Sequence, residues 1–168
     1  MDDLRQMRLT PRGTGFPRDG SAGETAPRRA LAKCRVVMAP ATAALVASNA
    51  VNKGDVLATA RVAGIQAAKK AAELLPMSHL VLVGNTYINF EIGDSFIDVE
   101  ASVDTNDRTG VEMEALTAVT VAALTIYDMC KNADRTMSIE NVALWEKTGG
   151  RSGTWRRDEV TEEASDPT

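Results

Sequence analysis

The sequence has few aromatic residues, only two cysteines and a single histidine. Aromatic residues make up 4% of the chain, although hydrophobic residues together reach 44%. A core without large rings has to be built by close packing of helices, and another subunit can complete part of it. Two cysteines and one histidine exclude a disulfide scaffold and the usual set of zinc ligands.

The sequence also lacks an excess of positive charge and a long apolar run. Its 19 basic and 23 acidic residues give a formal net charge of −4, which argues against a general nucleic-acid-binding or membrane-surface protein. No apolar run approaches the roughly 18 residues of a membrane span, and Met1-Asp2-Asp3 does not begin a signal peptide. The length of 168 residues suits one domain, so we expect a single cytoplasmic domain.

Both ends of the chain lack the periodicity of packed elements. Residues 1–30 contain four glycines, three prolines and six arginines without an apolar repeat. We therefore expect a flexible N-terminal arm over residues 1–30 and a disordered tail over residues 158–168. The folded domain is expected over residues 31–157.

The first half of this domain predicts a strand followed by a helix. Residues 34–38 form a short β-branched run before Pro40, which is typical of a strand, and residues 42–48 suit a brief helix. Residues 55–75 are rich in alanine, lysine, glutamate and leucine, so we expect a long helix with Asp55 near its N-cap and its end at Pro76.

The second half predicts a hairpin, another helix and a last strand. Residues 80–92 and 95–103 read as strands joined by a Gly93-Asp94 turn. Residues 111–131 suit a helix, and residues 136–145 a strand that breaks near Asn141. The order β-α-β-β-α-β is that of the ferredoxin-like α+β fold. We expect an antiparallel sheet with two helices on one face, and the other face and edges free for association.

The second long helix carries the clearest candidates for chemistry. Asp128 and Lys131 are three residues apart, so their side chains are neighbours on the helix. A solvated ion pair is the simpler interpretation. However, Ala115 to Tyr127 contains no charge, which suggests that the middle of this helix is buried and that its two ends carry functional residues. Glu112 and Glu114 at the other tip have a simpler interpretation too, a favourable interaction with the helix dipole.

Three loops supply further candidates. Lys53 precedes a glycine and a helix start, an arrangement that suits phosphate or simply a capped helix. His79 stands at a helix-to-strand junction, where it is either structural or functional. Lys147 opens a glycine-rich segment with Arg151 that can contact phosphate or form a flexible exit.

Five sequence blocks form a recognisable set: KGDVLATARVAGIQAAK (53–69), LPMSH (75–79), TGVEMEALTA (109–118), AALTIYDMCK (122–131) and KTGGRSG (147–153). The third block and the LTIYDMCK part of the fourth are long enough to be highly specific. Together they resemble the cyclic pyranopterin monophosphate synthase family, the molybdenum cofactor biosynthesis C proteins. The resemblance covers roughly residues 33–157. It implies rearrangement of 3′,8-cyclo-7,8-dihydro-GTP, the product of a radical-SAM GTP cyclase, into cyclic pyranopterin monophosphate and pyrophosphate.

The resemblance also implies roles and an assembly. Asp128 matches the catalytic acid, and Lys53 and Lys131 match essential lysines. The implied substrate-binding residues are Met77, Ser78, His79, Glu112, Met113, Glu114, Arg28 and Lys147. The implied assembly is a homohexamer, a trimer of dimers with sites between subunits. Such chemistry needs cations for the triphosphate, and a carboxylate held beside amines in partly dry surroundings.

An alternative keeps the fold and drops turnover. The chain reads Met77-Ser78-His79-Leu80-Val81 where the family usually has Leu-Cys-His-Pro-Leu, and its N-terminal arm differs as well. A divergent paralogue that binds a purine nucleotide, or an interaction subunit, would fit these departures. In either case we expect no resident cofactor or metal, with Mg²⁺ able to accompany the triphosphate or the pyrophosphate.

Overall fold

A computed structural model describes residues 7–9, 15–17 and 24–157 of the chain. Its main sheet is antiparallel, in the order β4-β5-β3-β6-β7, and a separate two-stranded sheet pairs β1 (Met7–Leu9) with β2 (Gly15–Pro17). The main strands are β3 (Ala26–Val37), β4 (Thr86–Ile92), β5 (Phe96–Asp107), β6 (Ser138–Thr148) and β7 (Trp155–Arg156). The helices are α1 (Pro40–Ala47), α2 (Val56–Leu74) and α3 (Glu112–Cys130). The tail expected over 158–168 and most of the expected arm lie outside the described residues.

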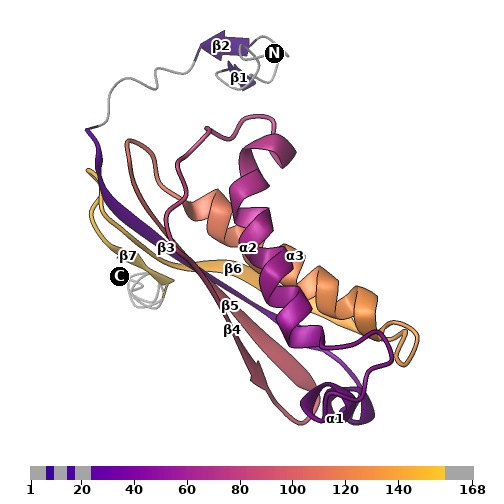
Figure 1. Cartoon of the computed structure of the whole chain (residues 1–168). Coiled ribbons are helices and arrows are strands. Elements are labelled where there is room, and N and C mark those ends of the chain that lie inside the picture. Colours follow the sequence, from indigo (N-terminus) through magenta and orange to yellow (C-terminus); the bar gives the residue numbers. More distant parts are fainter. Residues whose placement is uncertain (1–6, 10–14, 18–23, 158–168) are drawn as a thin grey trace, which may run out of the picture.

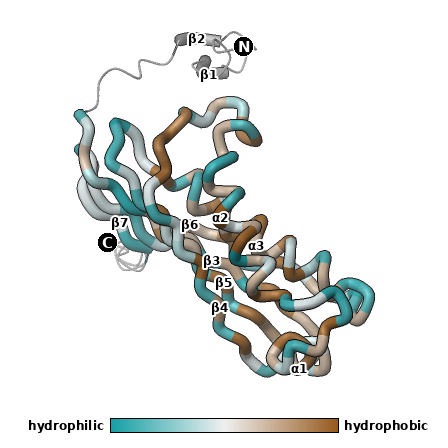
Figure 2. Tube along the Cα trace, viewed as in Figure 1, coloured by the Kyte–Doolittle hydropathy of each residue, from teal (hydrophilic) through white to brown (hydrophobic). Residues whose placement is uncertain are grey.

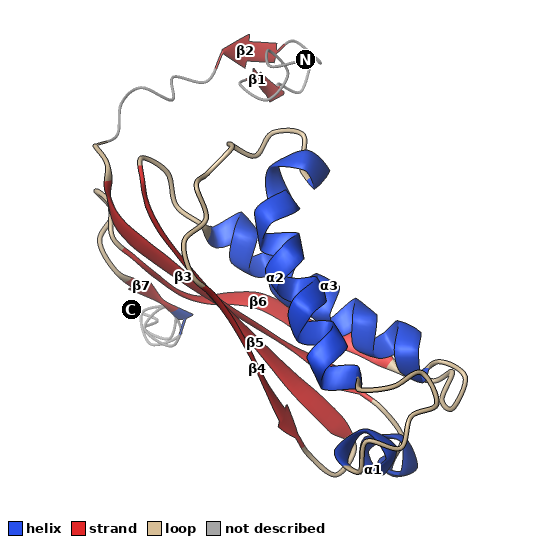
Figure 3. Cartoon of the chain, viewed as in Figure 1, coloured by secondary structure: helices blue, strands red, loops and turns tan. Residues whose placement is uncertain are grey.

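The predicted fold class is confirmed. Strands β6, β3, β5 and β4 lie side by side in the order of a ferredoxin-like fold, and each neighbouring pair is antiparallel. Helices α2 and α3 pack together on one face of this sheet, as Figures 1 and 3 show. The short α1 and β7 are additions to the β-α-β-β-α-β pattern. The break expected near Asn141 is present, because this residue has a positive φ of 55° beside a shift in register between β3 and β6.

The first strand is longer than the sequence pattern indicated. We expected it over residues 34–38, but β3 begins at Ala26, inside the segment assigned to the arm. Its early part pairs with the end of β5, for example Arg28 with Thr105. The inward positions Ala30 and Ala32 are buried. Alanine has little strand preference, so pairing with two neighbouring strands outweighs the weak local signal.

The hairpin also differs in its details. Strand β4 begins at Thr86 rather than at residue 80, although the backbone of Gly84 still donates to the Asp104 carbonyl at 2.8 Å. The turn is centred on residues 94–95, one position later than predicted, because the Gly93 amide already donates to Phe96. A Cβ at Gly93 would lie 2.2 Å from the Phe96 ring. A larger residue at this position would therefore require the Phe96 ring to move.

The core consists mainly of alanine and β-branched side chains. The largest side chains that are fully buried are Ile97 and Ile126, followed by valines. Cys34 and Cys130 are free and buried, and burial raises the pKa of the Cys34 thiol to about 12. Both cysteines therefore act as small apolar groups, as expected. Because the fully buried side chains of the described residues are no larger than isoleucine, α2 and α3 can lie close to the sheet and to each other.

Helix α3 is long and apolar enough, by length and composition alone, to cross a membrane. Its buried residues include Ala115, Val119, Ala123 and Ile126, which pack in the hydrophobic core. Contacts with β3, β5 and β6 place this helix on the sheet. Its apolar composition is accounted for by this packing.

The open face of the sheet is polar. Lys33 pairs with Glu100 at 3.3 Å, and Arg35 pairs with Asp98 at 2.7 Å. The Arg35 guanidinium also lies 3.8 Å from the centre of the Phe96 ring. Any partner that covers this face would have to accommodate paired charges. Apolar colour is instead seen in Figure 2 along the connection from α2 to β4, which contains Leu80 to Val83.

Gly64 marks the closest approach of α2 to its neighbours. A Cβ at this position would meet Ile88 Cδ1 at 3.0 Å and the Ala118 carbonyl oxygen at 3.1 Å. We expect Gly64→Val to lower the free energy of unfolding by about 2 kcal/mol, because a branched side chain cannot enter this contact without moving the helix. Urea denaturation at one fixed protein concentration measures the loss.

The matched control is Ala58→Val, at an exposed position of the same helix. It should cost only about 0.5 kcal/mol, the difference in helix propensity between valine and alanine. Equal losses at the two positions would show that the contact at Gly64 has room for a side chain.

Candidate active site

Three charged side chains meet at the C-terminal end of α3. Lys131 Nζ donates to Asp128 Oδ1 at 2.6 Å. Lys53 Nζ donates to the backbone carbonyl of Asp128 at 3.0 Å and lies 3.6 Å from its Oδ2. Lys53 comes from a segment 75 residues earlier in the chain. The group is therefore more than the helix pair of neighbouring residues that the simpler interpretation assumed.

The local structure explains how Lys53 reaches this place. Asp55 caps α2 by accepting the Ala58 amide at 3.0 Å, as the sequence predicted. Gly54 has a positive φ of 108°, a conformation that other residues rarely adopt. The chain thus turns sharply between the lysine and the helix, and the lysine side chain extends toward the end of α3.

The electrostatics of this group favour an ionised carboxylate. The hydrogen bond from Lys131 is the main cause that lowers the pKa of Asp128, and the charges of Lys131 and Lys53 add to it. The Asp128 side chain is 58% exposed. The partly dry surroundings that we expected for such chemistry are therefore absent within one chain, where water screens these charges.

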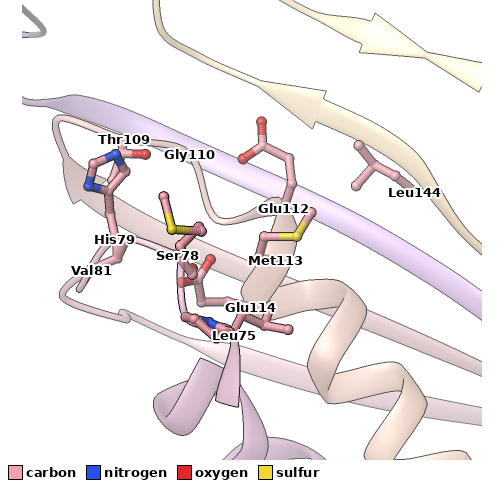
Figure 4. A pocket seen from close by; sticks show the side chains of 12 residues that line it. Leu75, Ser78, His79, Val81, Thr109, Gly110, Glu112, Met113, Glu114 and Leu144 are labelled. Carbon is pink, nitrogen blue, oxygen red and sulfur yellow. The ribbon is translucent and has the colours of Figure 1, made fainter. Parts of the chain in front are cut away.

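A cavity of about 750 Å³ lies at the opposite end of the helix pair. It is lined by the end of α2, the following loop and the start of α3, as Figure 4 shows. Six of the eight predicted substrate-binding residues line it: Met77, Ser78, His79, Glu112, Met113 and Glu114. The carboxylates of Glu112 and Glu114 leave the first turn of α3 in different directions. The sequence blocks around residues 77 and 113 thus meet in space, as the resemblance implied.

The other two predicted residues lie at the same end of the molecule. Lys147 Nζ is 3.6 Å from Glu112 Oε1 and donates to Ser152 at 2.7 Å. Arg28 donates to the backbone carbonyl of Asp107 at 3.0 Å, and its guanidinium occupies the space beside Gly150. Lys147 therefore contacts a residue of the cavity wall, whereas Arg28 lines a separate hollow together with Leu82 and Asp104.

The two groups of residues do not come together in one chain. Glu114 and Asp128 are 14 residues apart on the same helix, which corresponds to about 21 Å along its axis. Lys53 precedes α2 and residues 77–79 follow it, so the length of α2 imposes a similar separation between them. The group of Lys53, Asp128 and Lys131 is called the lysine–aspartate group below, and the other is called the cavity.

Sequence reasoning missed several residues that line the cavity. Thr109 and Gly110 precede α3 and form part of its wall, together with Leu75, Val81 and, from β6, Leu144. Thr109 and Gly110 could have been found from their place beside Glu112. Leu144 gives no such signal, because only the pairing of β6 in the sheet brings it there. Within the described residues, no three His, Cys, Asp or Glu side chains are placed to share a metal ion.

Comparison with known proteins gives a consistent family. A family model described as the MoaC family matches residues 19–150, a region that contains both groups of residues. The chain is 54% identical over 134 residues to a cyclic pyranopterin monophosphate synthase of Chloroflexus aggregans, covering 79% of this chain and 81% of the relative. It is 46% identical over 159 residues to cyclic pyranopterin monophosphate synthase 3 of Mycobacterium tuberculosis, covering 94% and 90%.

Glu114 is buried in the cavity wall, and burial is the main cause that raises the pKa of its carboxyl group. A raised pKa in the folded state means that the group stabilises the fold while protonated, and that this contribution is lost as the pH rises through the folded pKa. We therefore expect Glu114→Gln to raise the unfolding temperature at neutral pH. The gain should vanish below the ordinary pKa of 4.5.

Thermal unfolding followed by circular dichroism over this pH range measures the effect. Glu73→Gln, at an exposed position near the end of α2, is the control and should show no such gain. A Glu114→Gln variant with unchanged stability at neutral pH would show that the ionised carboxylate is well solvated or paired.

Proposed function

The chain belongs to the MoaC family, and on that premise we propose that it is a cyclic pyranopterin monophosphate synthase. The proposed reaction converts 3′,8-cyclo-7,8-dihydro-GTP into cyclic pyranopterin monophosphate and pyrophosphate. One structural observation supports it above the others. Asp128 contacts Lys131 at the end of its own helix and also Lys53 from a segment 75 residues earlier, although a solvated helix pair needs only one lysine. The alternative, a paralogue without turnover, is favoured by the departures from the family pattern at residues 77–81, but it does not account for the contact between Lys53 and Asp128.

The lysine–aspartate group suits a rearrangement that proceeds through proton transfers. The lowered pKa of Asp128 keeps its carboxylate ionised before the reaction, and in this proposal the carboxylate takes up a proton from the substrate and returns it as the catalytic acid. Lys131 and Lys53 supply two ammonium groups beside it, which can attract phosphate oxygens and return a proton. Covering this group by protein would remove water and strengthen each of these interactions.

The cavity suits the rest of the substrate. Its volume of about 750 Å³ lies in the range of small-molecule sites. Glu112 and Glu114 offer carboxylate oxygens to the N–H groups of a guanine-derived ring. Met77 and Met113 offer polarisable apolar surface to the faces of that ring. In this proposal, Lys147 and Arg28 attract the phosphates, and His79 contributes a polar contact at the wall.

We propose that two copies of the chain share each site, because one copy keeps the two groups apart. Suppose that a twofold axis places the α2–α3 pairs of two copies side by side and in opposite directions. The lysine–aspartate group of one copy then meets the cavity of the other. Leu124 on α3 and Val62 on α2 are apolar and more than half exposed, so burying them would favour such an association. A trimer of such dimers gives the proposed homohexamer.

We also propose where the substrate comes from and in which compartment the protein acts. The substrate comes from a radical-SAM GTP cyclase, and the protein acts in the cytoplasm on a small molecule, without nucleic acid or membrane as partner. It uses no resident cofactor, and Mg²⁺ accompanies only the triphosphate or pyrophosphate. These statements rest on the proposed reaction.

A coupled assay with the radical-SAM partner and GTP tests the reaction, with the pterin product as the readout. We expect product only when this protein is present. Asp128→Asn and Lys131→Met should each lower turnover at least about a hundredfold, the usual contribution of a positioned acid or base. Lys70→Met, at an exposed position of α2, is the matched control and should keep full activity. Near-native turnover in either site variant would show that its assigned role is wrong.

Co-expression of two differently tagged variants tests the shared site. We expect Asp128→Asn and His79→Ala to be inactive separately, and mixed assemblies to recover about a quarter of the activity, because one in four randomly assembled sites is intact. Asp128→Asn mixed with Lys131→Met is the control and should recover nothing, since both defects lie at the same end. Light scattering should give a mass near six times 18.0 kDa. Recovery in the control, or a monomer, would contradict the shared site.

A further inference from the structure

Asp134 is a buried carboxylate that none of the roles above uses. Only 7% of its surface is exposed. Its Oδ2 accepts the Ala39 amide at 2.8 Å and the Thr42 hydroxyl at 3.1 Å. Its Oδ1 accepts the amide and the hydroxyl of Thr136 at 2.9 and 2.7 Å. A buried charge is costly unless its hydrogen bonds are satisfied, and here four neutral donors satisfy it.

The two oxygen atoms of Asp134 bind different parts of the chain. Ala39 and Thr42 belong to the start of α1, and Thr136 belongs to the loop between α3 and β6. Ala39 has no side chain that could cap α1. Asp134, 95 residues away, instead accepts the backbone amide of the N-cap residue and ties the start of this helix to the loop. This arrangement is called the Asp134 clip below.

Both segments that the clip joins lead to the lysine–aspartate group. The loop begins directly after α3 with Lys131, and the amide of Asp134 donates back to the Cys130 carbonyl at 3.1 Å. Helix α1 leads through residues 48–52 to Lys53. A small cavity of about 300 Å³ separates the two segments, and Lys53, Asn52 and Asn132 line it. The contact between Lys53 and Asp128 is made by a long, 40% exposed side chain, so it cannot by itself hold the segments in place.

We propose that Asp134 is a positioning residue, which sets the distance between the Lys53 segment and the end of α3 and thereby holds both lysines on Asp128. This proposal rests on the proposed function for its kinetic consequences, but its structural part stands alone. The donors around Asp134 lower its pKa to about 2, the Ala39 amide most of all, so the Asp134 carboxylate stays ionised at neutral pH.

The clip offers a matched pair of variants. Thr42→Val removes a hydrogen bond that crosses from α1 to Asp134, and Thr136→Val removes one that stays within the loop. Both replace a hydroxyl by a methyl group of similar shape. If the clip acts by joining the two segments, Thr42→Val should affect the lysine–aspartate group strongly and Thr136→Val should not.

Kinetics in the coupled assay provide the first readout. Asp134→Asn keeps only one accepting oxygen, so we expect kcat to fall about tenfold to a hundredfold, the scale of a small misplacement of reacting groups. KM should change less than kcat, because the contacts proposed for the ring belong to a cavity that the other copy supplies, and the cavity on the same chain lies about 21 Å from Asp128. Thr42→Val should lower kcat severalfold, and Thr136→Val should leave it nearly unchanged.

Hydrogen exchange at neutral pH provides a readout that does not need turnover. In Asp134→Asn and Thr42→Val, peptides covering residues 48–55 should exchange faster, and those covering residues 76–85 should not change. Equal kcat losses in Thr42→Val and Thr136→Val, or unchanged exchange over residues 48–55, would overturn the proposal. If the wild-type protein shows no turnover, the proposed function fails, and the exchange result still decides whether the clip positions Lys53.

Discussion

The close packing of α2 against α3 and the sheet is the constraint on which the other features depend. Gly64 and the buried alanines of both helices let the backbones approach without large side chains between them. The two helices have 19 residues each and span much of the sheet. Along α3, the residues between Glu114 and Asp128 carry no charge, so its acidic side chains stand only near its two ends. The candidate site residues are divided between these ends for that reason.

This division has a consequence for association. Each end holds half of what the proposed reaction needs: an ionised carboxylate with two cations at one end, and a cavity with acidic and apolar walls at the other. The lysine–aspartate group is exposed, so its charges interact weakly until protein covers it. A second copy that supplies a cavity would also supply this cover. Association of two copies would then both complete the proposed site and strengthen the interactions of its charges.

Inside the chain, the two ends are stabilised in different ways. The cavity end includes a buried carboxyl group, Glu114, whose ionisation the fold disfavours. The other end includes Asp134, whose ionisation the fold favours through four hydrogen-bond donors. The fold therefore disfavours the charge of one buried acid by burial and satisfies the charge of the other by hydrogen bonds.

Local sequence pattern was sufficient for most of the fold. The apolar periodicity of residues 55–75 and 111–131, the Asp55 cap and the break at Asn141 depend on nearby residues, so they could be predicted without the structure. The blocks around residues 77, 113 and 128 likewise allowed candidate site residues to be named from the sequence. What the sequence could not show was the early start of β3 at Ala26, because alanine becomes a strand residue there only through pairing with β5 and β6. Only the tertiary structure decided which site residues meet: it brought Lys53 to Asp128 across 75 residues and kept His79 at the far end, because the directions of α2 and α3 set these distances.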